Sequence, residues 1–369
     1  MTFTAEALGD VKADLAGPQH DDVHALQYPT LTAITVDTVD LSDLGEFGFL
    51  ERVRRWVPDG SALVGIGDDA AVARVSDGAA LVATVDTLVE GVHFRWGWSS
   101  PADVGHKSVA VNMSDLAAMG ATPRWILLSL CAPSSTSEDL LHELIDGLGD
   151  ACANYGAELI GGDTVAGDQL VISVTALGEV EGDPLLRSGA KPGDVLAVTG
   201  PLGRAAVGVN LLLSQNPRKV SPEDALACID AHRRPVARVD EGRRLRRGGA
   251  HAAIDLSDGL ASDVRRLTEA SGVGAEIDIE RVPVAPEASR VAEARGWDVE
   301  QIVLGGGEDY ELLVALPSDQ AGSLRGGAFG ASGGVGLVEI GRVVDEGLWL
   351  VRRGRREPLV FEGWDHFKS

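Results

Sequence analysis

Short apolar runs alternate with amphipathic segments along most of the chain. Runs of four to eleven residues rich in Ala, Val, Leu and Ile are typical of strands. They predict strands over 79–85, 125–132, 157–160, 170–180, 195–199, 252–255, 310–316 and 335–344. Segments with apolar residues at helical spacing predict helices. These cover 46–57, 102–119, 205–213 and 235–247, and a further helix begins near Gly259. Another helix is expected between the capping-box pattern at 135–138 and Gly156.

The alternation of helix and strand signals predicts an α/β or α+β fold built in layers. A domain boundary is expected at the turn residues Gly182-Asp183-Pro184. We therefore expect an N-terminal domain over 45–183 and a C-terminal α/β domain over 184–369. Residues 1–44 show no sustained periodicity, and we interpret them as an N-terminal extension.

Acidic residues gather beside glycines and apolar runs in four places, at 65–69, 84–87, 161–164 and 254–259. Glycine lets the backbone approach a ligand closely, and short aspartates at strand ends present oxygens to hard cations. Any one such pair is more often a turn or a helix cap. Four clusters that all follow apparent strands favour a shared metal site for a phosphorylated substrate.

A narrow polar stripe marks the predicted helix at 102–119. Ser108, Asn112 and Asp115 recur at i, i+4 and i+7 among apolar residues, so they share one face. Such a stripe faces either solvent or a site. Glu, Lys or Arg would be usual toward solvent, and we therefore prefer a site, with Asp115 as a metal ligand.

Charge and cysteine usage narrow the classes of partner. The 369 residues hold 32 Lys and Arg against 56 Asp and Glu, a formal charge of −24, which argues against nucleic acid or an anionic membrane as a partner. The three cysteines form no CxxC pair, and we expect a reducing cytoplasm. No apolar run approaches the roughly 18 residues that span a bilayer, so we expect no membrane insertion.

Common nucleotide and zinc motifs do not occur. The chain has no GxxxxGK[ST] loop, and Gly305-Gly306-Gly307-Glu308-Asp309 is not a GxGxxG fingerprint. His93, His106 and His142 have no Cys or His partner at zinc-ligand spacing. An ATP site would therefore depend on the acidic clusters and on placed arginines.

The order of several motifs resembles the thiamine-monophosphate kinases. The resemblance covers residues 45 to the C-terminus, and the extension at 1–44 departs from it. It is carried by GIGDDAAV from Gly65, VDTLVEGVHF from Val85, VNMSDLAAMGATP from Val111, IGGDT from Ile160, RSGAKPGD from Arg187, AIDLSDGL from Ala253, GGGEDYEL from Gly305 and GWDHF from Gly363.

This resemblance implies a two-domain fold of the aminoimidazole ribonucleotide synthetase type, with N-terminal sheets that form a homodimer and ATP in a cleft at the interface. It implies several Mg²⁺ ions held by Asp69, Thr84, the Val85 backbone, Asp86, Asp115, Asp163, Asp255 and Asp258. It implies ATP contacts from Gly162, Asp163, Arg187 and Ser257. It also implies substrate contacts from His93, Glu308 and Trp364, while the roles of Asp68 and Lys107 stay open.

The expected reaction is transfer of the γ-phosphoryl group of ATP to thiamine monophosphate. In-line positioning and charge neutralisation do most of the work in such a transfer, so we expect no covalent or general-base residue. One alternative is a related enzyme that uses ATP to activate a carbonyl or selenide. The other is a non-catalytic acidic metal-binding protein.

Overall fold

The structure is a computed structural model that describes residues 39–360, except 59, 67–69, 215–219 and 320–335. These described residues belong to one compact unit by their contacts. Of the extension expected at 1–44, residues 1–38 therefore lie outside the described residues. No helix in the described ranges is long and apolar enough to cross a membrane.

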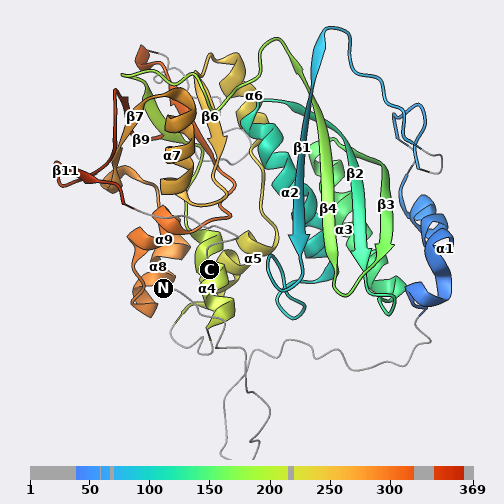
Figure 1. The fold of residues 1–369 in the computed structure, drawn as a ribbon. Coiled ribbons are helices and arrows are strands. Elements are labelled where there is room, and N and C mark those ends of the chain that lie inside the picture. Colours follow the sequence, from blue (N-terminus) through green and yellow to red (C-terminus); the bar gives the residue numbers. More distant parts are fainter. Residues whose placement is uncertain (1–38, 59, 67–69, 215–219, 320–335, 361–369) are drawn as a thin grey trace, which may run out of the picture. The chain divides into compact units, whose positions relative to one another are not determined.

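The first part of the chain forms a sheet of four strands with helices on one face. The strands run in the order β1 (Ala79–Val89), β4 (Val171–Glu181), β2 (Thr122–Ala132) and β3 (Glu158–Ala166). The helices α2 (Pro101–Ala118) and α3 (Glu138–Tyr155) cover that face, and α1 (Leu41–Trp56) lies beside them (Figure 1). The apolar sides of these elements form one core.

The second part is built around a seven-stranded sheet. Its order is β11 (Arg355–Pro358), β10 (Leu348–Arg352), β7 (Gly274–Asp278), β9 (Val338–Val344), β5 (Val195–Val198), β8 (Leu312–Leu316) and β6 (Ala252–Asp255). Its helical segments are α4 (Arg204–Leu213), α5 (Pro222–Arg233), α6 (Val239–Arg247), α7 (Leu260–Ser271), η2 (Ile279–Arg281), α8 (Pro286–Arg295) and α9 (Val299–Gly305). The predicted mixture of helix and strand is confirmed.

Local sequence signals explain where the two central helices begin and end. Ser100 caps α2 by accepting a hydrogen bond from Asp103 N, and Ser137 caps α3 in the same way. Gly156 follows α3 in the left-handed conformation, φ 70°, which favours glycine. The predicted stop at Gly156 is therefore confirmed, whereas the N-cap is Ser137, two residues after the Ser135 at which the capping-box pattern starts.

Two glycines allow α2 and α3 to touch along their backbones. A Cβ at Gly105 would lie 2.0 Å from Leu144 O, and one at Gly147 would lie 2.1 Å from Ala102 O. Since real Cβ atoms do not approach so closely, only glycine fits these positions. The contact fixes α2 between α3 and the second part of the chain.

The predicted helix over 235–247 begins late. In the structure α6 starts at Val239, because tertiary hydrogen bonds hold the preceding residues in another conformation. His106 Nε2 lies 2.9 Å from Pro235 O, and Ala237 N donates to the Tyr155 hydroxyl over 2.9 Å. In a helix that began at 235, the Pro235 carbonyl would instead accept from Val239 N.

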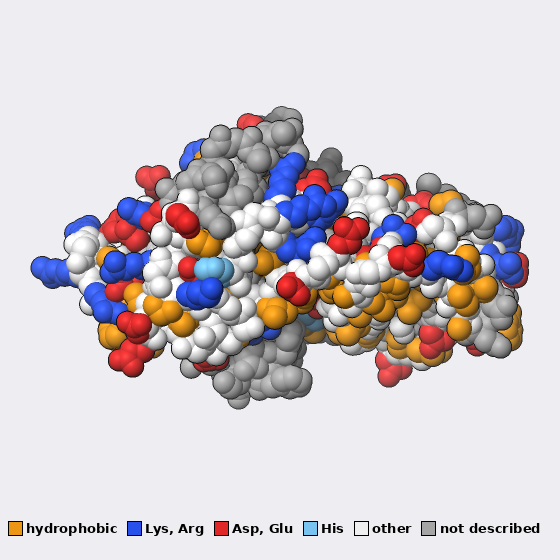
Figure 2. All heavy atoms as spheres, turned by 90° about the horizontal axis from the view of Figure 1, so that it is seen from above, with side chains coloured by type: hydrophobic (Ala, Val, Ile, Leu, Met, Phe, Trp, Pro, Cys, Tyr) orange, Lys and Arg blue, Asp and Glu red, His pale blue; other side chains and the backbone are white. Residues whose placement is uncertain are grey.

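The face of the four-stranded sheet opposite α2 and α3 is not covered by described residues of this chain. Leu81, Val85 and Val165 expose 51%, 60% and 49% of their surface. Figure 2 shows hydrophobic side chains gathered along one side of the half of the molecule that holds this sheet. This surface is here called the open sheet face.

Candidate active site

The polar stripe of α2 faces the sheet rather than solvent. Asn112 accepts a hydrogen bond from Asp86 N over 3.0 Å and donates to Ser108 O over 2.9 Å. Thr84 on β1 donates to Asp115 Oδ2 over 2.5 Å. Ser108 and Asn112 are fully buried. The stripe therefore places Asp115 beside the middle of β1, where Asp86 also lies.

A second pair of acids reaches the same region from the C-terminal sheet. Asp255 ends β6, and its carboxylate accepts a hydrogen bond from Ser114 of α2 over 2.8 Å. Asp258 follows in the turn before α7 and forms an ion pair with Arg266. Gly259 closes this turn with φ 104°, a conformation that favours glycine. Strand end, turn and helix start thus present Asp255 and Asp258 together.

The pKa values of Asp86 and Asp255 reflect both burial and the charges of neighbouring carboxylates. Burial raises the pKa of Asp86 to about 6, and the charges of Asp115 and Asp258 add to the effect. Burial also raises the pKa of Asp255 to about 7, with Asp115 and Asp86 contributing. Like charges in a partly desolvated site repel, so a cation or a bound metal complex would relieve the repulsion.

Arg187 lies near enough to counter part of this negative charge. Burial raises the pKa of Asp115, while the hydrogen bond from Thr84 and the charge of Arg187 lower it. The Arg187 backbone is held by Ser271, which donates to its carbonyl over 3.0 Å. Its exposed guanidinium is thus available to a phosphate beside the carboxylates.

Asp163 and Gly162 do not join this group within one chain. They lie on β3, which is the third strand from β1 in the sheet order. At the usual distance between neighbouring strands, β3 and β1 are about 14 Å apart. The exposed Asp163 pairs in register with exposed Ser129, so its side chain is on the open sheet face, whereas Asp86 faces α2. A Cβ at Gly162 would lie 1.9 Å from Leu128 O, which gives strand packing as the reason for that glycine.

Two of the acids expected at strand ends are in fact inside strands. Asp86 lies within Ala79–Val89 and Asp163 within Glu158–Ala166, so the expectation of strand exits is wrong for both. It is correct for Asp255. The side chain of Val85 points to the open sheet face, as alternation with Asp86 requires. Asp68, Asp69 and Trp364 lie outside the described residues.

The expected substrate contacts His93 and Glu308 are joined by a lysine. The ammonium of Lys107 on α2 lies 2.6 Å from Glu308 Oε1 and 3.3 Å from the carbonyl oxygen of His93. His232 Nδ1 lies 2.5 Å from the other Glu308 oxygen, Oε2. These charges overcome burial and hold the pKa of Glu308 at about 2.

The local backbone explains how Glu308 reaches this position. Glu308 has φ 64° and Tyr310 has φ 49°, a region that residues other than glycine rarely adopt. Hydrogen bonds from Glu308 N to Ser257 O and from Tyr310 N to Leu256 O hold the segment against the Asp255–Asp258 turn. The carboxylate turn and the Glu308 segment therefore form one unit.

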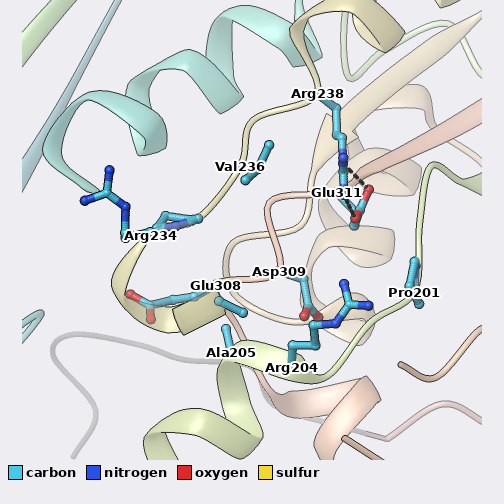
Figure 3. Close-up of a pocket in the computed structure, with 11 residues that line it drawn as sticks. Pro201, Arg204, Ala205, Arg234, Val236, Arg238, Glu308, Asp309 and Glu311 are labelled. Atoms are coloured by element: carbon cyan, nitrogen blue, oxygen red, sulfur yellow. Dashed lines mark hydrogen bonds and ion pairs between the residues drawn. The ribbon is translucent and has the colours of Figure 1, made fainter. Parts of the chain in front are cut away.

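A cavity of about 90 Å³ adjoins Glu308 on the side of the C-terminal domain. Figure 3 shows Arg238 paired with Glu311 and the carboxylates of Glu308 and Asp309 pointing in different directions. Arg238 Nε donates to Glu311 over 2.8 Å, and Gly203 N donates to Asp309 over 2.8 Å. The walls of the cavity are therefore fixed by internal pairs.

Sequence reasoning left Lys107 without a role and passed over His232. A lysine within an otherwise apolar helix was the available signal for Lys107, which is only 2% exposed. His232 stands among polar residues of α5, where nothing local distinguishes it. Among the described residues, no three His, Cys, Asp or Glu side chains lie close enough together to hold a metal ion alone.

Known proteins are similar to this chain in both sequence and fold. The chain matches the AIR synthase related protein family, with the N-terminal domain over residues 67–180 and the C-terminal domain over residues 191–349. The thiamine-monophosphate kinase of Escherichia coli K12 is 41% identical over 336 residues, which are 88% of this chain and 99% of that protein.

Solved structures agree with this match. The crystal structure of thiamine-monophosphate kinase from Stenotrophomonas maltophilia K279a has a TM-score of 0.73 at 38% identity and covers 83% of this chain and 96% of its own. A structure described as AaThiL complexed with AMPPCP and TMP has a TM-score of 0.71 at 34% identity, with 90% and 100% covered. The chain with its acidic site between two AIR synthase related domains therefore belongs to the thiamine-monophosphate kinase family.

Proposed function

We propose that this chain transfers the γ-phosphoryl group of ATP to thiamine monophosphate and so forms thiamine diphosphate and ADP in the cytoplasm. The observation that carries the proposal is the meeting of Asp86, Asp115, Asp255 and Asp258 from both halves of the chain, where burial and neighbouring carboxylates raise the pKa values of Asp86 and Asp255. Family membership supports the same reaction, because relatives that span nearly the whole chain are thiamine-monophosphate kinases.

The donor chemistry of the site fits Mg²⁺ bound together with a triphosphate. Carboxylate oxygens are the ligands that Mg²⁺ prefers, and it usually takes one or two of them, completing its shell with water and substrate phosphates. The site agrees with this preference. Its carboxylates lie close enough to affect one another's pKa, but among the described residues no three acidic, His or Cys side chains could hold a metal ion alone. Asp86, Asp115, Asp255 and Asp258 would hold the ions, which would neutralise charge on the triphosphate.

The residues of the chain would act by positioning the two phosphates. The guanidinium of Arg187 would bind a phosphate oxygen beside Asp115, while His93 and Glu308 would orient the acceptor. An oxygen of the acceptor phosphate then attacks the γ-phosphorus in line as the bond to the leaving ADP oxygen breaks. A phosphate monoester with a second pKa of about 6 is already ionised at pH 7, so no protein base is needed.

We further propose that the open sheet face pairs two copies of the chain. Its exposed apolar residues Leu81, Val85 and Val165 are typical of a surface that a partner covers. Pairing would also give a use to Asp163, which this face presents away from the carboxylate group of its own chain, and to Gly162 beside it. They would then bind ATP at the interface.

The reaction is tested with purified protein, ATP, MgCl₂ and thiamine monophosphate by measuring ADP and thiamine diphosphate together. We expect equal amounts of the two products and no thiamine diphosphate when thiamine replaces thiamine monophosphate. ADP release that depends on a different acceptor would indicate the related carbonyl- or selenide-activating chemistry instead. Metal binding without any ATP-dependent product would indicate a non-catalytic metal-binding protein.

Direct transfer has its own test. With γ-labelled ATP and no acceptor, the protein is expected to stay unlabelled, because no side chain becomes phosphorylated in an in-line transfer. Label that appears on the protein and then moves to thiamine monophosphate would replace this mechanism with a two-step one.

A further inference from the structure

Lys107 is the residue whose burial most needs an explanation. It lies in the middle of α2, and its side chain is 2% exposed. A buried ammonium is costly unless it is paired and hydrogen-bonded. Its neighbours are Glu308 Oε1 at 2.6 Å, His93 O at 3.3 Å and His232 Nδ1 at 3.3 Å. The first two belong to the proposed acceptor site.

The proton positions within this cluster follow from the contacts. Glu308 is ionised, so its oxygens only accept, and the 2.5 Å contact from His232 Nδ1 to Oε2 requires the proton on Nδ1. His232 Nδ1 therefore cannot accept from Lys107. Lys107 and His232 instead both donate to the carboxylate of Glu308, Lys107 to Oε1 and His232 to Oε2. The two contacts fix the rotation of the Glu308 side chain.

Lys107 also joins the two halves of the acceptor site. His93 follows β1, and its ring Nδ1 accepts a hydrogen bond from Val89 N over 3.1 Å, so its proton is on Nε2. Glu308 comes from the segment before β8, far along the chain. A single ammonium donates to the backbone of one and to the side chain of the other.

We propose that Lys107, supported by His232, is a positioning residue for the phosphate acceptor: it holds the carboxylate of Glu308 and the backbone of His93 in the arrangement that thiamine monophosphate binds. This inference rests on the proposed function. It assigns Lys107 no contact with ATP, whose phosphates belong to the separate group around Asp86 and Asp115. A role in stability alone would weaken binding of both ligands.

The test compares Lys107→Met with Lys191→Met as a matched control. Lys191 also lies beside a histidine that pairs with an acid, since its ammonium is 3.4 Å from His251 Nε2 and His251 Nδ1 is 2.8 Å from Asp194. That cluster touches neither His93 nor Glu308. Calorimetry with MgCl₂ measures the Kd of thiamine monophosphate and, separately, that of AMPPCP.

We expect Lys107→Met to raise the Kd of thiamine monophosphate about tenfold or more, as loss of one partner of a buried charge pair does. The Kd of AMPPCP should change less than about twofold, and Lys191→Met should change neither beyond that. Equal weakening of both ligands in Lys107→Met overturns the inference. Failure of the wild-type protein to bind thiamine monophosphate would instead count against the proposed function.

A double variant shows whether Lys107 acts through Glu308. In Glu308→Gln the carboxylate is gone, so adding Lys107→Met should raise the Kd of thiamine monophosphate by less than about threefold. The same loss in both backgrounds would mean that Lys107 acts independently, against the inference. If Lys107→Met alone does not fold, the comparison of Glu308→Gln with the double variant still tests whether Lys107 acts through Glu308. In the double variant both charges of the Lys107–Glu308 ion pair are removed, so neither is left unpaired.

Discussion

Asp309 gives a prediction whose size can be worked out from its surroundings. Burial raises its pKa from 3.8 to about 8, and the charges of Glu311 and Glu308 add to the shift, while the hydrogen bond from Gly203 N opposes it. Between these two pKa values the unfolded chain loses the proton and the folded chain keeps it. Ionisation therefore favours the unfolded state increasingly as the pH rises from about 4 to 8.

The expected slope is about 1.4 kcal/mol of unfolding free energy per pH unit. Asp309→Asn removes the titration, while its side-chain oxygen can still accept from Gly203 N. From pH 5 to 7, the unfolding free energy of the wild-type protein should fall by about 3 kcal/mol relative to this variant. Above the folded pKa of about 8 the difference should level off.

Urea unfolding of both proteins at pH 5, 6, 7, 8 and 9 measures this difference. Asp224→Asn is the control, because the hydrogen bond from Arg290 lowers the pKa of Asp224 and both states are then ionised throughout. Its difference from the wild-type protein should stay flat from pH 5 to 9. A flat difference for Asp309→Asn, within about 1 kcal/mol, would refute burial of an uncompensated carboxyl at this position.

Other predictions concern the metal site, helix packing and assembly. Asp86→Asn should lower kcat/KM about a hundredfold or more if it removes one electrostatic stabiliser of the transition state, and steady-state assays with full activity would exclude that role. Gly147→Ala should destabilise the fold by about 1–3 kcal/mol in urea, since its Cβ would lie 2.1 Å from Ala102 O, whereas Gly149→Ala on the same helix has open space and should not. Leu81→Lys, on the open sheet face, should shift the protein from dimer to monomer in sedimentation, and an unchanged mass would contradict the proposed interface.

Local patterns predicted the elements and part of the site. Apolar periodicity identified the strands and helices, and the spacing of Ser108, Asn112 and Asp115 identified the face of α2 that meets β1. The end of β6 was correctly expected to present Asp255. These features depend on residues close together in sequence, so a local pattern contains the information.

Features that depend on contacts between segments far apart in the sequence could not be predicted from local patterns. The strand order β1-β4-β2-β3 separates Asp163 from Asp86, and alternation along the strands sends the two side chains to opposite faces. The cluster of Lys107, His232 and Glu308 brings together three distant segments. Pro235 and Ala237 bond to other helices, which delays the start of α6.

Successive residues of α2 touch opposite halves of the molecule. Asp115 accepts from Thr84 on β1, and Ser114 donates to Asp255 on β6. Neighbouring side chains on an α-helix point about 100° apart. Turning the helix toward one partner would pull it away from the other. The two contacts therefore allow α2 only one rotation about its own axis. A substitution that shifts either contact would therefore move the carboxylates of both halves at once.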